Sequence, residues 1–199
     1  MQLSHYVDVD IITPANETGW MMGKVMRQLH GYLSANEINT IGVAFPELKN
    51  NHPGNQLRIF GDQTALARLI KGSNLLFLQE SGGIKLIQCL NTPEVNTFVS
   101  YRRSQRADRG SPKGLKKGQE RFIQYLKNKG IEPDQTILKA RAHRWHKEYQ
   151  AERAFLSIGS KSTGQQFQLC IQQTLSSKPT EGYFSSYGLS KSGTTLPYF

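Results

Sequence analysis

The sequence predicts an α+β fold in two parts, residues 1–92 and residues 93–199, and three observations support that division. Up to residue 90, alternating and helical apolar patterns follow one another with short polar loops between them. Residues 101–150 then combine two helical patterns with most of the excess positive charge. Strand-like runs return after residue 153. A chain of 199 residues, of which 37% are hydrophobic, can bury a core in one domain or in two small ones.

The first part contains the clearest periodic patterns. Apolar and acidic residues alternate at 7–11, which is typical of a half-buried strand. Apolar residues then recur at helical spacing from Thr18, the expected capping residue, to Leu33, so that His30 falls at the border of the apolar stripe. The expected elements are a strand at 7–11, a helix at 18–33, strands at 40–45 and 56–60, a helix from 62 or 64 to 72, and a strand at 84–90.

This order of strand, helix, strand, strand, helix, strand is the split arrangement of ferredoxin-like domains. We therefore expect residues 1–92 to form a ferredoxin-like, or RRM-like, N-terminal domain. RNA-recognition domains share the architecture, but the fold also hosts many unrelated functions. The fold class alone thus does not decide what the chain does.

The second part mixes basic helices with strands. Pro112 begins a helical pattern that Gly130 ends, and another helix runs from Pro133 to about Tyr149. We expect residues 93–199 to form a smaller domain with basic helices and a β-hairpin or sheet. Its expected strands lie at 97–105, 154–159, 166–174 and 183–187, and a turn at 188–193 precedes the tail.

Positive charge is concentrated in one segment. The chain carries a net charge of +10, from 25 Lys and Arg against 15 Asp and Glu. Residues 101–150 hold 14 of the basic and 5 of the acidic residues, so nearly the whole excess lies there. Such a concentration is typical of a phosphate-binding face and predicts an acidic partner. A solvent-exposed helical face without a partner is the alternative interpretation.

The cysteines and the apolar runs indicate the compartment. Cys89 and Cys170 lie in apolar, strand-like runs and cannot form a disulfide framework, which indicates a reducing environment. No apolar run reaches the length needed to cross a bilayer, and the N-terminus lacks a signal-peptide pattern. We therefore expect a cytoplasmic protein without a membrane partner.

Metal and nucleotide chemistry do not fit the motifs. His143 and His146 lack a third ligand at zinc spacing, so neither a metal nor another cofactor is expected. Gly159 is followed by Ser160 and a strand rather than by the Lys and the helix of a phosphate loop. Neither Ser160 nor Ser162 has the flanking glycines of a hydrolase nucleophile. The sequence also lacks the helix-turn-helix pattern that a DNA-binding repressor needs.

The remaining pattern suits metal-free RNA cleavage, in which a ribose 2′-hydroxyl attacks the neighbouring phosphate. A histidine at a helix border, such as His30, can act as the base. The polar turn at 157–167 supplies hydroxyls and backbone amides that can hold the 2′-oxygen and the phosphate, and Phe167 offers a face for a base. The alternatives are a structural role for His30 and a core position for Phe167.

Five short motifs follow one another along the chain. They are RQLHGYL around His30, IGVAFPE at 41–47, VSYRRSQ at 99–105, GSKSTGQQF at 159–167 and SSYGLSKSG at 185–193. Together they resemble the landmarks of the CRISPR repeat-processing endoribonucleases of subtype I-F, the Csy-type enzymes. The resemblance spans nearly the whole chain, and Ser-x-Ser-Thr-Gly-Gln followed by Tyr-Gly-Leu-Ser is its most specific part.

The resemblance implies metal-independent cutting of a precursor CRISPR RNA at the 3′ side of its repeat hairpin. The products would carry a 2′,3′-cyclic phosphate and a 5′-hydroxyl. The enzyme would stay on the crRNA with other subunits of a type I-F crRNA-guided complex. By motif, His30 is the general base, Ser160 orients the 2′-hydroxyl and Tyr187 positions the histidine. The alternative is a structural subunit that holds the CRISPR RNA hairpin and cuts it slowly or not at all.

The resemblance also implies contacts with the RNA. Phe167 would stack on the base pair at the foot of the stem, and Arg103 and Gln105 would read bases there. The helix after Pro112 would bind phosphate, although it carries lysines where family members can carry arginines. The alternatives are a phosphate contact for Arg103 and a buried position for Tyr187. The RNA-binding candidates are Arg102, Arg103, Gln105, Lys116, Lys117, Arg121, Ser162, Thr163 and Phe167.

Overall fold

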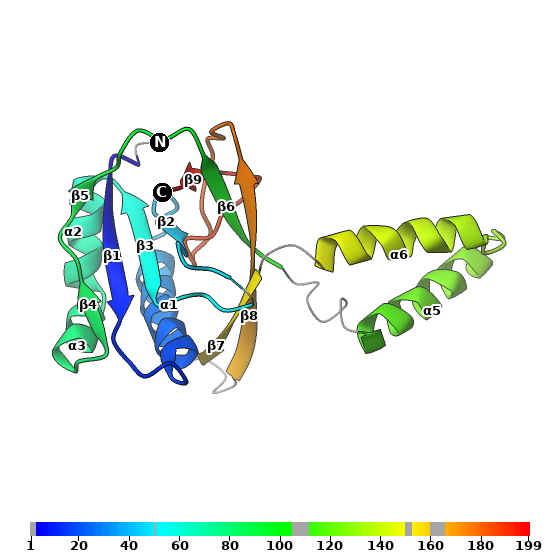
Figure 1. Ribbon diagram of the computed structural model, residues 1–199, viewed down its shortest axis with the longest axis horizontal. Helices are drawn as coiled ribbons and strands as arrows, with labels where there is room; N and C mark the ends of the chain where they lie inside the picture. Colours follow the sequence, from blue (N-terminus) through cyan, green and yellow to red (C-terminus); the bar gives the residue numbers. More distant parts are fainter. Residues whose placement is uncertain (1–2, 50, 105–111, 150–152, 160–165) are drawn as a thin grey trace. The chain divides into compact units, whose positions relative to one another are not determined.

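The computed structural model describes residues 3–49, 51–104, 112–149, 153–159 and 166–199 of the chain (Figure 1). Contacts between residues divide the chain into two compact units. Unit 1 consists of Met1–Arg103 and Glu152–Phe199, and unit 2 is Ser104–Ala151. These units divide the chain differently from the predicted ranges 1–92 and 93–199, because the later strands fold with the N-terminal half.

The first sheet of unit 1 is antiparallel. Its strands are β1 (His5–Ile11), β2 (Gly42–Ala44), β3 (Gln56–Gly61) and β4 (Ile84–Leu86) in the order β2-β3-β1-β4, and β5 (Leu90–Asn91) also pairs with β1. The predicted alternation sets the buried face, since Val7 and Val9 are buried opposite Ile59 and Leu57. Together with the helices, this sheet confirms the predicted α+β class. The ferredoxin-like identity of residues 1–92 stays a prediction.

The helices of unit 1 are α1 (Thr18–Ala35), α2 (Gln63–Gly72) and α3 (Leu75–Glu80). α1 buries one stripe of apolar side chains, including Leu29, and leaves His30 half-buried at its border, as the periodicity predicts. The expected cap is wrong, because Glu17 is the N-cap residue and no side chain caps this helix. Thr18 is buried instead, with its hydroxyl 3.5 Å from the carbonyl oxygen of Pro14.

The second sheet of unit 1 is built from the later segments. Its strands are β6 (Phe98–Arg103), β7 (Arg153–Gly159), β8 (Gln166–Ser176) and β9 (Leu196–Pro197), in the order β7-β8-β6-β9. Tyr101 on β6 is fully buried, and its hydroxyl donates a hydrogen bond to the carbonyl of Phe45 at 2.9 Å. Burial raises the pKa of Tyr101, so this donor stays protonated. Both sheets share one hydrophobic core, which explains why unit 1 extends past residue 92.

Two predicted strands of unit 1 differ from the structure, and one helix was not predicted. The expected strand at 84–90 is divided into β4 and β5, which both pair with β1. Residues 183–187 form no strand, because Phe184 makes only an isolated bridge to Ser190. The N–H of Val43 donates to the carbonyl of Gly188 at 2.9 Å, and Gly188 has a φ of +70°, so the segment turns against β2. The periodicity also fails to predict α3, since its six residues fall short of two full turns.

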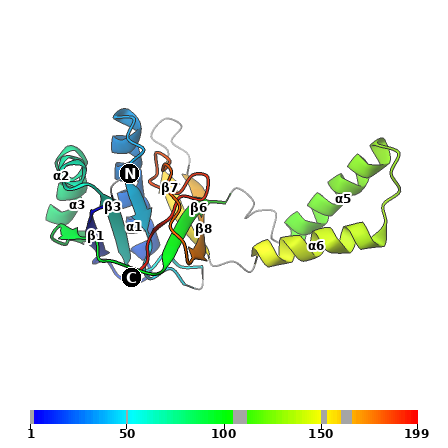
Figure 2. The same ribbon diagram turned by 90° about the horizontal axis from the view of Figure 1, so that it is seen from above.

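Unit 2 is a pair of helices, α5 (Pro112–Asn128) and α6 (Gln135–Tyr149), which Figures 1 and 2 both draw side by side. Leu126 is buried, and the guanidinium carbon of Arg141 lies 4.1 Å from the centre of the Phe122 ring. Gly130 follows α5 with a φ of +70°, a conformation that glycine adopts without strain. Among the described residues, no helix is both long enough and apolar enough to cross a membrane.

Candidate active site

The ring of His30 on α1 stacks on the ring of Tyr187. The two ring centres lie 4.0 Å apart, and the planes differ by 4°. Tyr187 is held in a turn, because the hydroxyl of Ser185 accepts hydrogen bonds from the N–H groups of Tyr187 and Leu189 at 3.3 and 3.2 Å. The N–H of Gly188 donates to the carbonyl of Ser185 at 2.8 Å in the same turn. The stack therefore holds the imidazole plane against a fixed surface.

A backbone contact decides which nitrogen of His30 carries the proton. Nδ1 lies 3.2 Å from the carbonyl oxygen of Ser186. A carbonyl oxygen only accepts hydrogen bonds, so the neutral ring donates from Nδ1 and keeps Nε2 as its proton acceptor. His30 is half-buried rather than fully enclosed. Nε2 can therefore act as a general base for a substrate that reaches this face of α1.

The phenol beside this histidine stays protonated. Burial raises the pKa of Tyr187, and the nearby positive charge of Arg103 lowers it by a smaller amount. The Tyr187 hydroxyl is thus a hydrogen-bond donor at neutral pH. It carries no negative charge beside the imidazole of His30.

Arg103 and Phe167 extend the cluster around Tyr187. Arg103 is the last residue of β6, and its guanidinium carbon lies 5.8 Å from the centre of the Phe167 ring on β8. Phe167 is half-buried and packs against the hydrophobic core. Its ring therefore belongs partly to the core and partly to the surface beside Arg103. An aromatic ring next to a guanidinium is a surface on which a nucleic-acid base can stack.

Strand alternation separates Arg102 from this cluster. Neighbouring residues of a strand point to opposite faces of the sheet, so Arg102 and Arg103 lie on different faces. The guanidinium of Arg102 lies 3.4 Å from the side-chain oxygen of Gln172. It borders an open cavity of about 570 Å³, whose polar lining includes Ser100, Thr174, Ser176, Ser190 and Thr195.

α1 and β7 lie against each other. A Cβ on Gly23 would overlap the carbonyl oxygen of Ser157, so only glycine lets the helix come this close. Further along α1, Arg27 reaches the end of β7, where its Nη1 would lie 3.7 Å from a Cβ on Gly159. His30 follows on the same face of the helix. Arg27 is not among the sequence-based candidates, although its spacing from His30 is visible in the sequence.

Sequence comparison decides the family of the chain. The family model described as CRISPR-associated protein (Cas_Csy4) matches residues 6–199. The chain belongs to this family. Two curated relatives each match it at 28% identity, over 99% of this chain and 100% of their own length. Both are named CRISPR-associated endonuclease Cas6/Csy4, one from Escherichia coli (strain UTI89 / UPEC) and one from Pseudomonas aeruginosa (strain UCBPP-PA14).

Membership of the Cas_Csy4 family confirms the resemblance that the five motifs predict, and it assigns the chain as an endonuclease. Four of the candidate residues, Gln105, Ser160, Ser162 and Thr163, lie outside the described residues. Within the part of this Cas_Csy4 chain that the structure describes, no three His, Cys, Asp or Glu side chains are grouped as ligands of a metal ion.

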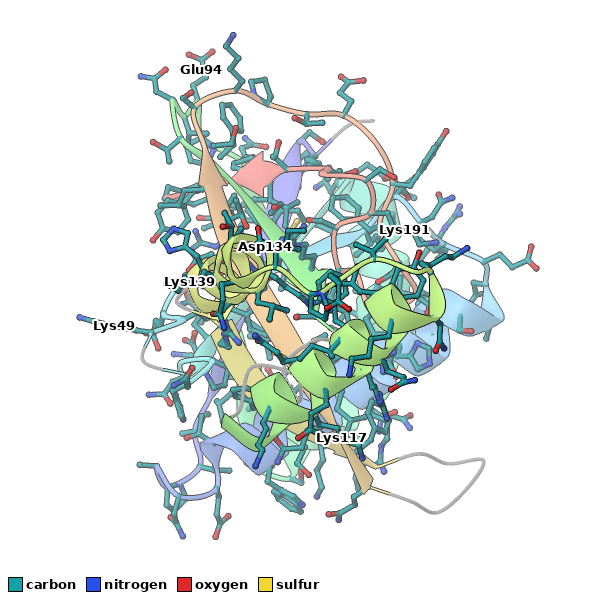
Figure 3. All side chains as sticks on the ribbon, turned by 90° about the vertical axis from the view of Figure 1, so that its right-hand side faces the viewer. Lys49, Glu94, Lys117, Asp134, Lys139 and Lys191 are labelled. Carbon is teal, nitrogen blue, oxygen red and sulfur yellow. The ribbon has the colours of Figure 1, made fainter. Side chains whose placement is uncertain are left out.

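Three of the basic candidates of this Cas_Csy4 chain lie in unit 2, whereas Arg102 and Arg103 lie in unit 1. Lys116, Lys117 and Arg121 are all exposed on α5, where Figure 3 labels Lys117. Lys117 and Arg121 are four residues apart and share one face of the helix. Exposed lysine side chains can reach phosphates as point charges, without the two-pronged geometry of a guanidinium.

Proposed function

We propose that this protein is a metal-independent endoribonuclease that recognises the stem-loop of a CRISPR repeat and cuts precursor crRNA at the 3′ side of the hairpin. Membership of the Cas_Csy4 family supports this substrate, and both relatives are named as CRISPR-associated endonucleases. The observation that carries the proposal is the environment of His30. A stacked tyrosine and a backbone carbonyl hold its imidazole with Nε2 left as a base.

The reaction begins when Nε2 of His30 takes the proton of the ribose 2′-hydroxyl beside the scissile phosphate. The 2′-oxygen attacks the phosphorus, and the bond from phosphorus to the 5′-oxygen of the next nucleotide breaks. That oxygen takes up a proton from the solvent as it leaves, and His30 then releases its own proton to the solvent. The products are a 2′,3′-cyclic phosphate and a 5′-hydroxyl, and no water is consumed because the nucleophile is part of the RNA.

Ser160 would orient the 2′-hydroxyl in this mechanism. It follows Gly159 directly in the sequence, and Gly159 ends β7 beside Arg27 of α1. Arg27 lies three residues before His30 on one face of α1. The contact of Arg27 with the end of β7 supports Ser160 as the residue that orients the 2′-hydroxyl.

RNA binding would involve both units. In unit 1, Arg103 and Gln105 would read bases at the foot of the stem, and Phe167 would stack on the last base pair. Ser162 and Thr163 would donate hydrogen bonds to phosphates next to the cut. In unit 2, the exposed basic residues of α5 would bind phosphates of the hairpin. We propose that the protein then keeps the mature crRNA within a type I-F crRNA-guided complex that contains other subunits.

A cleavage assay in EDTA tests this proposal. We expect the wild-type protein to cut its repeat RNA in EDTA. It should leave the RNA intact when the scissile nucleotide carries a 2′-deoxyribose, because the nucleophile is then missing. His30→Ala should abolish cutting and leave hairpin binding nearly unchanged, since the base is removed and the binding residues stay. Gel analysis of the products and a binding titration with the 2′-deoxy RNA provide the measurements.

His52→Ala is the matched control, because His52 is exposed in the loop between β2 and β3. It should cut at the wild-type rate. Cleavage of the 2′-deoxy RNA, or a loss of cutting in EDTA that Mg²⁺ restores, would contradict the mechanism. Tight hairpin binding without any cutting by the wild-type protein would identify a structural subunit instead. Loss of folding in His30→Ala would assign His30 a structural role.

A further inference from the structure

We propose that Arg27 binds the phosphate at the cleavage site and stabilises the negative charge that develops on it. The inference rests on the proposed function, because it requires RNA to reach His30. Arg27 carries a charge that no contact among the described residues explains. Nε of Arg27 is buried and, among the described residues, has no hydrogen-bond partner. A buried N–H without a partner is unfavourable and is rare in folded proteins.

Arg58 in the first sheet is an example of a structural arginine whose guanidinium has hydrogen-bond partners within the protein. It donates from Nε and Nη2 to the two carboxylate oxygens of Asp8 at 2.7 and 2.9 Å. Its Nη1 donates to the carbonyl oxygen of Phe199 at 2.9 Å. Within the described part of the chain, Arg27 has no such carboxylate. A guanidinium kept without an acidic partner suits an anion supplied by the substrate.

The position of Arg27 matches the proposed cleavage site. Its Nη1 lies beside Gly159 at the end of β7, directly before Ser160 in the sequence. Arg27 and His30 are three residues apart on α1, so their side chains are neighbours on one face. A phosphate whose adjacent 2′-hydroxyl reaches Nε2 of His30 would therefore lie within reach of the guanidinium.

The reaction suits a guanidinium at this place. Negative charge grows on the two non-bridging phosphate oxygens while the 2′-oxygen attacks. A guanidinium offers parallel N–H donors to two such oxygens, and it stays protonated, so Arg27 takes part in no proton transfer. Donors placed in advance near developing charge lower the barrier. Lys24, the preceding cation on α1, is engaged elsewhere, because its Nζ lies 3.6 Å from the centre of the Trp20 ring.

Single-turnover cleavage by Arg27→Ala tests this assignment. We expect the rate at saturating protein to fall about 10²- to 10³-fold, as on removal of one preorganised donor. Affinity for the 2′-deoxy hairpin should change little in comparison. Arg27→Lys should recover part of the rate, and added guanidinium ion should accelerate Arg27→Ala but not the wild type. Arg68→Ala is the matched control, since Arg68 is exposed on α2 and its loss removes the same charge.

A binding comparison makes the test independent of cleavage. It uses hairpin RNA that ends in a 2′,3′-cyclic phosphate and the same RNA that ends in a 3′-hydroxyl. The wild type should prefer the phosphate end by about tenfold, and Arg27→Ala should bind both ends equally. Should Arg27→Ala misfold by circular dichroism, Arg27→Lys and Arg27→Gln serve for the same comparisons.

Two results would overturn the role of Arg27. One is a wild-type cleavage rate in Arg27→Ala, and the other is a phosphate-end preference that Arg27→Ala retains. The two assays can also disagree, if the wild-type protein binds the phosphate end through Arg27 and still cuts no RNA. In that case the proposed catalytic function fails while the phosphate site remains.

Discussion

At the scale of single residues, the chemistry depends on what surrounds one imidazole. His30 is an ordinary helical histidine until Ser186 and Tyr187 are placed beside it. The carbonyl of Ser186 selects the tautomer, and the ring of Tyr187 holds the plane. Because burial raises the pKa of Tyr187, its phenol stays neutral next to the imidazole. A base nitrogen with a defined direction is what general-base catalysis requires.

Tyr187 should act through its ring rather than its hydroxyl. Tyr187→Phe keeps a ring stacked at 4.0 Å from His30 and should cut RNA nearly as fast as the wild type. Tyr187→Ala removes the ring and should slow cutting by about 10- to 100-fold, because the imidazole loses its fixed orientation. Single-turnover rates measure both effects, with the exposed Tyr183→Ala as control. Equal losses in Tyr187→Phe and Tyr187→Ala would assign the role to the hydroxyl.

At the scale of elements, α1 connects the core of unit 1 with the candidate site. Its apolar stripe is buried, and Gly23 brings its backbone against Ser157 of β7. That contact fixes the position of Arg27 and His30 relative to the end of β7. Glycine in a helix interior is destabilising by itself, so its use here is explained by the close approach it permits.

Two alanine substitutions in α1 distinguish the effect of the close contact with β7 on stability from the effect of helix propensity. Gly23→Ala should destabilise the protein by about 1–3 kcal/mol, because the added Cβ meets the Ser157 carbonyl. Gly31→Ala adds a Cβ with no atom within 4 Å and should stabilise the protein by about 0.5–1 kcal/mol. Denaturant unfolding of both variants measures the difference in free energy. Stabilisation by Gly23→Ala would be inconsistent with contact between α1 and β7.

At the scale of the whole molecule, unit 2 is inserted between two strands of unit 1. Arg103 on β6 and Ala154 on β7 both pair with Ile171 of β8, so β6 and β7 flank β8. Neighbouring strands lie about 4.8 Å apart, which places the two insertion points about 10 Å from each other. A few residues can span that gap. The fold of unit 1 therefore requires only a short connection between β6 and β7.

Replacement of residues 104–151 by about six Gly and Ser residues should leave unit 1 folded. We expect a cooperative thermal transition, together with weaker hairpin binding and a smaller salt dependence, because the lysines of α5 are gone. Residues 1–92 alone are the comparison and should not unfold cooperatively, since they lack Tyr101 and β7, which share the core. Two results together would favour a domain boundary at residue 92 over units 1 and 2. They are cooperative unfolding of residues 1–92 alone and failure of the linker variant to fold.

Local patterns predicted many of the helices and strands, because burial of one face repeats along the chain at the period of the element. The helix before Gly130 and the position of His30 at the border of α1 are examples. The same local pattern wrongly predicts a strand at 183–187, where hydrogen bonds to distant residues such as Val43 favour a turn. It also passed over Arg27, whose buried Nε becomes apparent only after packing.

Sequence patterns were enough to predict the α+β class, the segment with the excess positive charge and His30 as a candidate base, and the motifs predicted the family. Other features are visible only in the folded chain: Tyr187 stacks on His30, Arg103 lies near Tyr187, and Arg102 lies on the other face of the sheet. The spacing of apolar residues along the sequence shows which side of a single helix or strand is buried. Contacts between segments far apart in the chain depend on how the whole core packs, which no local pattern encodes.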